Sequence, residues 1–186
     1  LLEQMESGCG DAPRPRTDTY NTALTALVRA GWPVAVGAAP LAEGVPHGDR
    51  LLSSLVAAME RVGAAPDEYT VTTLLLAQDG IDAVNEVWAW ARRLGVRRTP
   101  AVWMHYIGAH LRHGQPRRVP ALLERMARDG CPLDIRAHNQ YLKACLACGD
   151  EAAALTHYAL LVTAAGAAST AEAAASAAPA DAPAPR

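Results

Sequence analysis

The sequence predicts an all-α protein in which helical hairpins stack into a solenoid. Apolar residues recur at helical spacing along most of the 186 residues. A glycine follows nearly every such segment, where it can close a helix in the left-handed conformation. No stretch shows the alternating pattern of a strand. The helices come in pairs, and each pair has an apolar face that only a neighbouring pair can cover.

Six helices are predicted from residue 50 onward, each with an apolar stripe and a glycine at its end. In chain order they span residues 50–63, 83–94, 101–113, 117–129, 137–148 and 151–165. The expected stops are Gly63, Gly95, Gly114, Gly130, Gly149 and Gly166. The stripe of residues 101–113, for example, consists of Val102, Trp103, Tyr106, Ile107, His110 and Leu111.

Two segments have a different composition. Residues 32–49 contain three prolines among glycines, which predicts a loop or an insertion. Residues 167–186 consist mainly of Ala, Ser and Pro and carry no large apolar side chain. Since packing cannot offset the entropy of ordering such a segment, it is predicted to be a disordered Ala/Pro-rich tail.

The hairpins repeat with a period of about 35 residues. Gly95 and Gly130 are 35 positions apart, as are Gly114 and Gly149. On this period the units are residues 17–67 with the loop insertion 32–49, then 68–99, 100–134 and 135–166. Residues 1–16 are interpreted as the end of a preceding repeat, so the chain is expected to be the C-terminal part of a longer protein.

Short motifs recur at fixed places in these units. Residues 19–24 read Thr-Tyr-Asn-Thr-Ala-Leu and are followed by Arg-Ala-Gly at 29–31. The units close with Met59 to Gly63 and Pro66-Asp67, and again with Met126 to Gly130 and Leu133-Asp134. This pattern resembles the pentatricopeptide repeat family, P-type. The rival is the tetratricopeptide repeat, whose Trp/Leu-Gly/Tyr pattern is not evident here.

The resemblance implies a right-handed α-α superhelix that binds single-stranded RNA, one base per repeat. In the family, the fifth and the last residue of a repeat face the base. The fifth residues are Asn21, Thr72, Met104 and Asn139, and the last are Asp67, Thr99 and Asp134, with Ser169 as a doubtful fourth. Asn with Asp favours uracil in the family, which implies uracil for the first unit. Of the second residues, which stack on bases, Tyr69 is the best suited and Arg136 can lie flat on a base.

Simpler interpretations of the same polar residues remain open. Asn21 and Asn139 lie near helix starts, and Asp67 and Asp134 are well placed to cap the next helix. An arginine cluster contacts phosphates or lies on the solvated convex face. Its members are Arg92, Arg93, Arg97, Arg98, Arg112, Arg117 and Arg118.

Several classes of function are not indicated. With 17 basic and 19 acidic residues, the formal charge of −2 gives no uniform field for nucleic acid or acidic membranes. No apolar run has the roughly 18 residues of a membrane span. Catalytic signatures and phosphate loops are absent, so neither an enzyme nor a cofactor is expected. His138, Cys145, Cys148 and His157 have the ingredients of a zinc site but pattern as repeat packing, so no metal is expected.

The expected function is therefore sequence-selective binding of single-stranded RNA in a chloroplast or mitochondrion, with a targeting segment upstream. Binding would support transcript stability, processing or translation. The alternative is a scaffold that uses the same solenoid to hold proteins or a ribosome.

Overall fold

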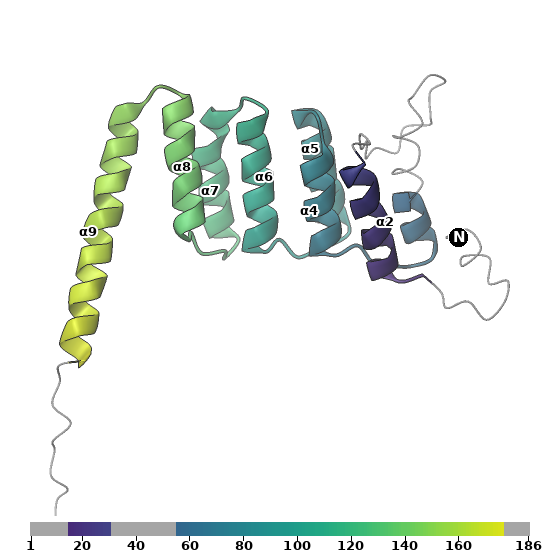
Figure 1. The fold of residues 1–186 in the computed structure, drawn as a ribbon, viewed down its shortest axis with the longest axis horizontal. Helices are drawn as coiled ribbons and strands as arrows, with labels where there is room; N and C mark the ends of the chain where they lie inside the picture. Colours follow the sequence, from purple (N-terminus) through teal and green to yellow (C-terminus); the bar gives the residue numbers. More distant parts are fainter. Residues whose placement is uncertain (1–14, 31–54, 177–186) are drawn as a thin grey trace, which may run out of the picture.

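A computed structural model describes residues 15–30 and 55–176, with the backbone alone for 165–176. In this part of the chain every regular element is a helix, which confirms the predicted all-α class (Figure 1). Most of the preceding repeat (1–16), the loop 32–49 and residues 177–186 of the tail lie outside the described residues.

The helices alternate as first and second members of hairpins. They are α2 (Thr17–Arg29), α4 (Glu68–Ala77), α5 (Ile81–Arg93), α6 (Pro100–Arg112), α7 (Val119–Arg128), α8 (Ile135–Ala147) and α9 (Glu151–Ser176). Residues 55–61 are also helical, and a 3-10 turn, η1 (Pro116–Arg118), leads into α7. The residues predicted to open the four units are the first residues of α2, α4, α6 and α8.

Five of the predicted glycine stops are confirmed. Gly63, Gly95, Gly114, Gly130 and Gly149 have φ between 69° and 79°. This left-handed conformation turns the chain back so that the next amide reaches a carbonyl of the last turn; Val96, for instance, donates to Ala91 at 3.0 Å.

The prediction that a helix ends at Gly166 is wrong. The helix α9 continues through Gly166 to Ser176, so residues 167–176, predicted to begin the disordered tail, are helical in the structure. Alanine, the best helix former, surrounds Gly166 and offsets the roughly 1 kcal/mol that one glycine costs inside a helix. In the part of the chain that the structure describes, none of the helices is both long and apolar enough to cross a membrane.

The hairpins stack side by side. In Figure 1, α2, α4, α6, α8 and α9 form a row, with α7 behind it. Each of the first helices α2, α4 and α6 contacts the first helix of the next pair. The second helix α5 contacts both α4 and α6, and α7 contacts both α6 and α8. By contrast, no Cα of α5 lies within 8 Å of a Cα of α7, so the second helices stand apart while the first helices touch.

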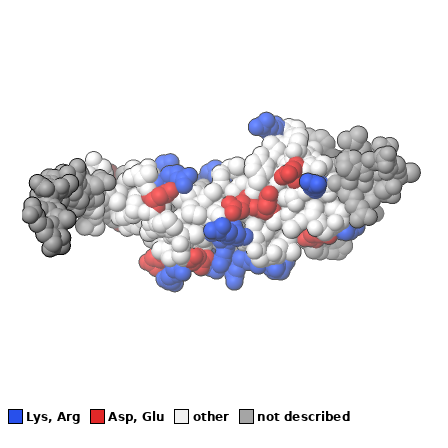
Figure 2. All heavy atoms as spheres, turned by 90° about the horizontal axis from the view of Figure 1, so that it is seen from below, with Lys and Arg blue, Asp and Glu red and all other residues white. Residues whose placement is uncertain are grey.

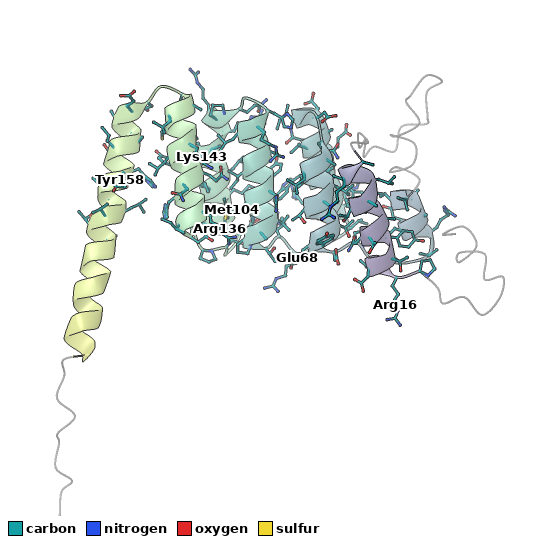
Figure 3. All side chains as sticks on the ribbon, in the orientation of Figure 1. Arg16, Glu68, Met104, Arg136, Lys143 and Tyr158 are labelled. Atoms are coloured by element: carbon teal, nitrogen blue, oxygen red, sulfur yellow. The ribbon has the colours of Figure 1, made fainter. Side chains whose placement is uncertain are left out.

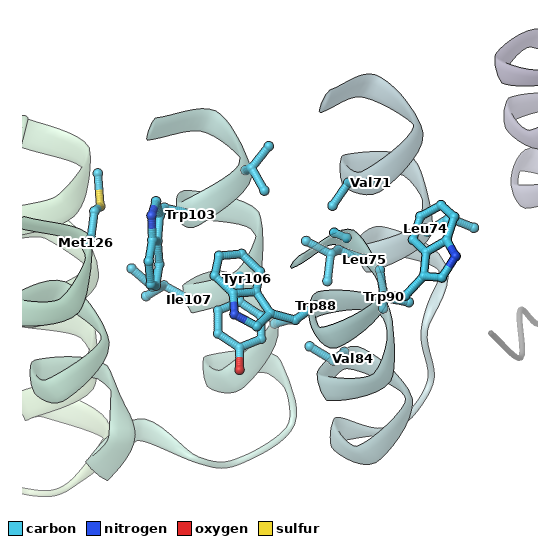
Figure 4. Close-up of a cluster of buried hydrophobic side chains, with 14 of the residues drawn as sticks. Val71, Leu74, Leu75, Val84, Trp88, Trp90, Trp103, Tyr106, Ile107 and Met126 are labelled. Atoms are coloured by element: carbon cyan, nitrogen blue, oxygen red, sulfur yellow. The ribbon is translucent and has the colours of Figure 1, made fainter. Parts of the chain in front are cut away.

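Aromatic side chains fill the core between α5 and α6 (Figure 4). Trp88 stacks on Tyr106 with ring centroids 4.0 Å apart, and Trp103 lies 4.6 Å from Trp88 in a tilted arrangement. The Tyr106 hydroxyl donates to Asn85 Oδ1 at 2.8 Å, which satisfies the polar end of a mostly buried ring. These contacts fix the angle between two successive units.

Candidate functional site

Two adjoining hollows lie along the first helices. The first, of about 640 Å³, lies between α2 and the start of α4 and is lined by Asp18, Asn21, Arg29 and Asp67, among others. The second, of about 590 Å³, lies between α2, α4 and α6. Its lining includes Glu68, Thr72, Leu76 and His105. Side chains from three consecutive units therefore border one continuous surface.

Tyr69 lines both hollows and stands where they meet. Its side chain is 53% exposed, although it belongs to the first turn of α4. The hydroxyl of Thr25 donates to the Asn21 carbonyl at 2.8 Å, so the Tyr69 hydroxyl, 3.2 Å away, is the donor to Thr25 Oγ1. This bond ties the far end of the ring to α2. The result is an exposed aromatic ring whose position is fixed at both ends.

A hydrogen-bond network joins the first unit to the second at Asn21. Its Nδ2 donates to both carboxylate oxygens of Asp67, at 3.0 and 3.2 Å. Its Oδ1 accepts from the Thr70 hydroxyl at 2.6 Å. These bonds fix the orientation of the Asn21 amide, with its nitrogen toward Asp67 and its oxygen toward Thr70. Asn21 is only 6% exposed, so most of the amide lies beneath the surface of the hollow.

Asp67 is also the N-cap of α4, because its Oδ1 accepts from the Thr70 amide at 2.8 Å. Burial raises the pKa of this carboxyl. The hydrogen bonds from the Thr70 amide, from the Thr70 hydroxyl, whose one proton is shared between Asp67 and Asn21, and from the Asn21 amide lower the pKa by more, so it lies below its ordinary value. Asp67 is therefore ionised near neutral pH and acts only as an acceptor.

Thr72 and Thr99, the expected pair of the second unit, are not brought together at one hollow. The Thr72 hydroxyl lines the second hollow and donates to the Tyr69 carbonyl at 3.0 Å. Thr99 caps α6 and donates to Glu68 Oε2 at 2.8 Å. It lines a different, smaller hollow of about 410 Å³ that also includes Arg97.

The expected residues of the third and fourth units lie outside both hollows. Met104 is partly buried against the core, and Asn139 is exposed. Arg136 forms an ion pair with Asp134, the N-cap of α8, at 2.8 Å, and the position of Arg136 on α8 is visible in Figure 3. Asp134 caps α8; the Ala137 amide and then Arg136 hold the pKa of its carboxyl below the ordinary value.

Arg29, Glu68 and His105 are among the surface residues that the sequence did not assign to base or phosphate contacts. His105 directly follows the fifth residue Met104, and successive helical residues are about 100° apart. His105 can therefore line a hollow that the fifth residue, Met104, does not line. Burial, and then the charge of Arg112, lower the pKa of His105. Glu68, the first residue of α4, has no motif that could have singled it out.

The seven arginines of the predicted cluster line neither hollow. Arg98 pairs with Asp129 at 3.1 Å, and Arg112 donates to the Leu75 carbonyl at 3.4 Å. Figure 2 shows basic and acidic groups interspersed on one face of the molecule. This placement supports the interpretation of a solvated surface for the cluster.

His138 and His157, two of the residues considered for a zinc site, lie next to each other. His138 Nδ1 lies 3.1 Å from His157 Nε2, between α8 and α9. Burial, and then His138, lower the pKa of His157. Cys145 is buried and Cys148 exposed. Among the described residues no three His, Cys, Asp or Glu side chains come together as ligands for one metal ion.

No protein-family model matches the chain, and no curated protein is similar enough to be matched. The function is therefore argued from the geometry of the two hollows.

Proposed function

We propose that the chain binds single-stranded RNA along its first helices, as a right-handed superhelical array of the pentatricopeptide type. Bound RNA is protected from nucleases or kept unfolded, without any bond chemistry by the protein. The proposed setting is a chloroplast or mitochondrion, where such binding acts on transcript stability, processing or translation.

The observation that carries this proposal is Tyr69. An exposed ring between two hollows can stack against a base on either side, and stacking is the main sequence-tolerant contact to single strands. The first hollow adds the ionised Asp67 as an acceptor for a base edge, held in place by the mostly buried Asn21 amide. These polar groups lie next to the ring, as base recognition requires.

The spacing of the helices supports a concave binding face. The first helices touch one another, whereas α5 and α7 stand more than 8 Å apart at every Cα. A row of hairpins whose first helices are closer together than its second helices curves toward the first helices. The first helices, and with them both hollows, would then line the inner surface of the superhelix.

The test is the affinity of the chain for short fluorescent single-stranded RNAs, measured by anisotropy. The substitution Tyr69→Ala should weaken binding by about 5- to 100-fold, since stacking contributes about 1–3 kcal/mol per base. Tyr158→Ala is the matched control, because Tyr158 is similarly exposed, at 58%, but lies on α9 away from the hollows. Equal affinities of both variants and the original chain would exclude the surface as an RNA site.

A protein scaffold is the second candidate, favoured by one observation. The helix α9 contacts only α8 among the described elements and exposes large apolar side chains. They are Leu155, Tyr158, Leu160 and Val162, with exposed fractions of 52–69%. A patch of this kind is typical of protein–protein contacts. This function would be favoured if the original chain did not bind RNA and if Leu155→Ser abolished the binding of a protein partner.

A further inference from the structure

The second hollow differs from the first in the chemistry of its lining. Thr72 was expected to read the base there, but its only proton is directed to the Tyr69 carbonyl at 3.0 Å. The hydroxyl therefore offers an acceptor to a ligand and no donor. Thr99, its expected partner, lines a separate hollow.

Glu68 takes the place that Thr99 was expected to hold. It lines the second hollow from the first turn of α4, where the helix dipole favours a carboxylate. The Thr99 hydroxyl donates to its Oε2 at 2.8 Å and so holds the side chain in place. Within the described part of the chain no hydrogen bond is made to Oε1. One oxygen of a positioned carboxylate is thus left to accept a hydrogen bond.

We infer that the second hollow prefers a base with an exocyclic amino group over uracil, and that Glu68 determines this selectivity. The inference rests on the proposed RNA binding. A carboxylate accepts readily from the cytosine or adenine amino group. Uracil carries only carbonyl oxygens at its exocyclic positions, and the carboxylate repels them. The acceptor of Thr72 adds to the same preference.

His105 completes the edge of this hollow from α6. A neutral imidazole carries one N–H donor and one acceptor nitrogen, and can bond to a ring nitrogen of the same base. Arg29, which lines both hollows, is available to a phosphate. The first hollow differs, since it contains Asn21 with Asp67, the pair for which the family resemblance implies uracil. The two neighbouring hollows therefore have opposite preferences.

The experiment places a single cytidine or adenosine at each position in turn of a short uridine-rich RNA. One position should bind the chain about 5- to 100-fold more tightly than the all-uridine strand. Glu68→Gln should abolish this preference, because an amide can bond to a carbonyl or to an amino group. Glu86→Gln is the control, since Glu86 is exposed on α5 and lines neither hollow. Helical circular dichroism of both variants verifies the fold.

The outcomes separate this inference from the proposed function. If the chain binds RNA but shows no preferred position, or keeps the preference in Glu68→Gln, the role of Glu68 is wrong and RNA binding stands. If no strand binds, and Tyr69→Ala changes nothing, the proposed function fails and the inference with it. Loss of preference in Glu68→Gln alone supports both.

Discussion

Asp67 has two structural partners where most helix caps have one. It caps α4 through the Thr70 amide, and it accepts from Asn21 of the preceding unit. Asn21 is only 6% exposed, so loss of the carboxylate leaves a mostly buried amide without its acceptor. An orphaned buried polar group typically costs about 1–3 kcal/mol, in addition to about 1 kcal/mol for a lost cap.

We therefore expect Asp67→Ala to lower the free energy of unfolding by about 2–4 kcal/mol in urea titrations. Asp134→Ala is the matched control, because Asp134 is also an N-cap but bonds only within its own helix. Asp134→Ala should lower the free energy of unfolding by about 1 kcal/mol. Equal losses would mean that the Asn21 link contributes nothing. The double substitution with Asn21→Ala should cost less than the sum of the single ones.

The same residue predicts an acid limit of stability. Because folding lowers the pKa of Asp67 below its ordinary 3.8, its contribution is present above about pH 4. It is lost as the pH falls through the folded-state pKa. Thermal melts between pH 5 and 2.5 should show a smaller decline for Asp67→Asn than for the original chain. An unchanged decline would assign the acid sensitivity to other carboxyls.

At the scale of the element, α6 carries a fully buried histidine in its last turn. His110 is 0% exposed and packs edge-on against Tyr106, with centroids 4.8 Å apart. Burial, followed by the charge of Arg118, lowers the pKa of His110 below 6.5. The folded protein keeps the ring neutral, while the unfolded chain takes up a proton below about pH 6.5. Stability is therefore full above this pH and declines below it.

His110→Phe should flatten this decline between pH 6.5 and 5, because the ring that resists protonation is gone. The measurement is the melting temperature against pH. The lowered pKa values of His105 and His157 predict that some slope remains in every variant. A His110→Phe profile parallel to the original would contradict the role of His110.

At the scale of the whole molecule, the charge is nearly balanced and the hollows are acidic. Asp18, Asp67 and Glu68 line them, and Arg29 is the one basic side chain in both linings. Few phosphates can therefore be neutralised, and RNA binding should depend only weakly on salt.

Arg29→Ala should make the slope of log K against log salt shallower by about 0.7. Arg92→Ala, exposed at the end of α5, should leave it unchanged; the opposite result would move the phosphate path to the arginine cluster.

Hairpin boundaries could be predicted from the sequence because local chemistry determines them. Two local signals are visible in a short stretch of sequence. One is a glycine in the left-handed conformation at a helix end, and the other is a helix that starts directly after Asp67, Thr99 or Asp134. Gly166 shows the limit of this reasoning, since neighbouring alanines override a single glycine. The bond from Thr99 to Glu68 joins residues 31 positions apart, and no local pattern indicates it. The repeat therefore predicted which helices face the site but not which of their side chains are available there.

The gap between α5 and α7 has a mechanical consequence. The backbones of successive first helices lie close together, whereas no Cα of α5 lies within 8 Å of a Cα of α7. The chain just beyond the ends of α5 and α7 is nevertheless joined, since Arg98 pairs with Asp129 at 3.1 Å and Cys131 Sγ donates to the Arg98 carbonyl at 3.2 Å. A change in the angle between these two hairpins would therefore strain this ion pair and this hydrogen bond first, while the closely packed first helices keep their spacing.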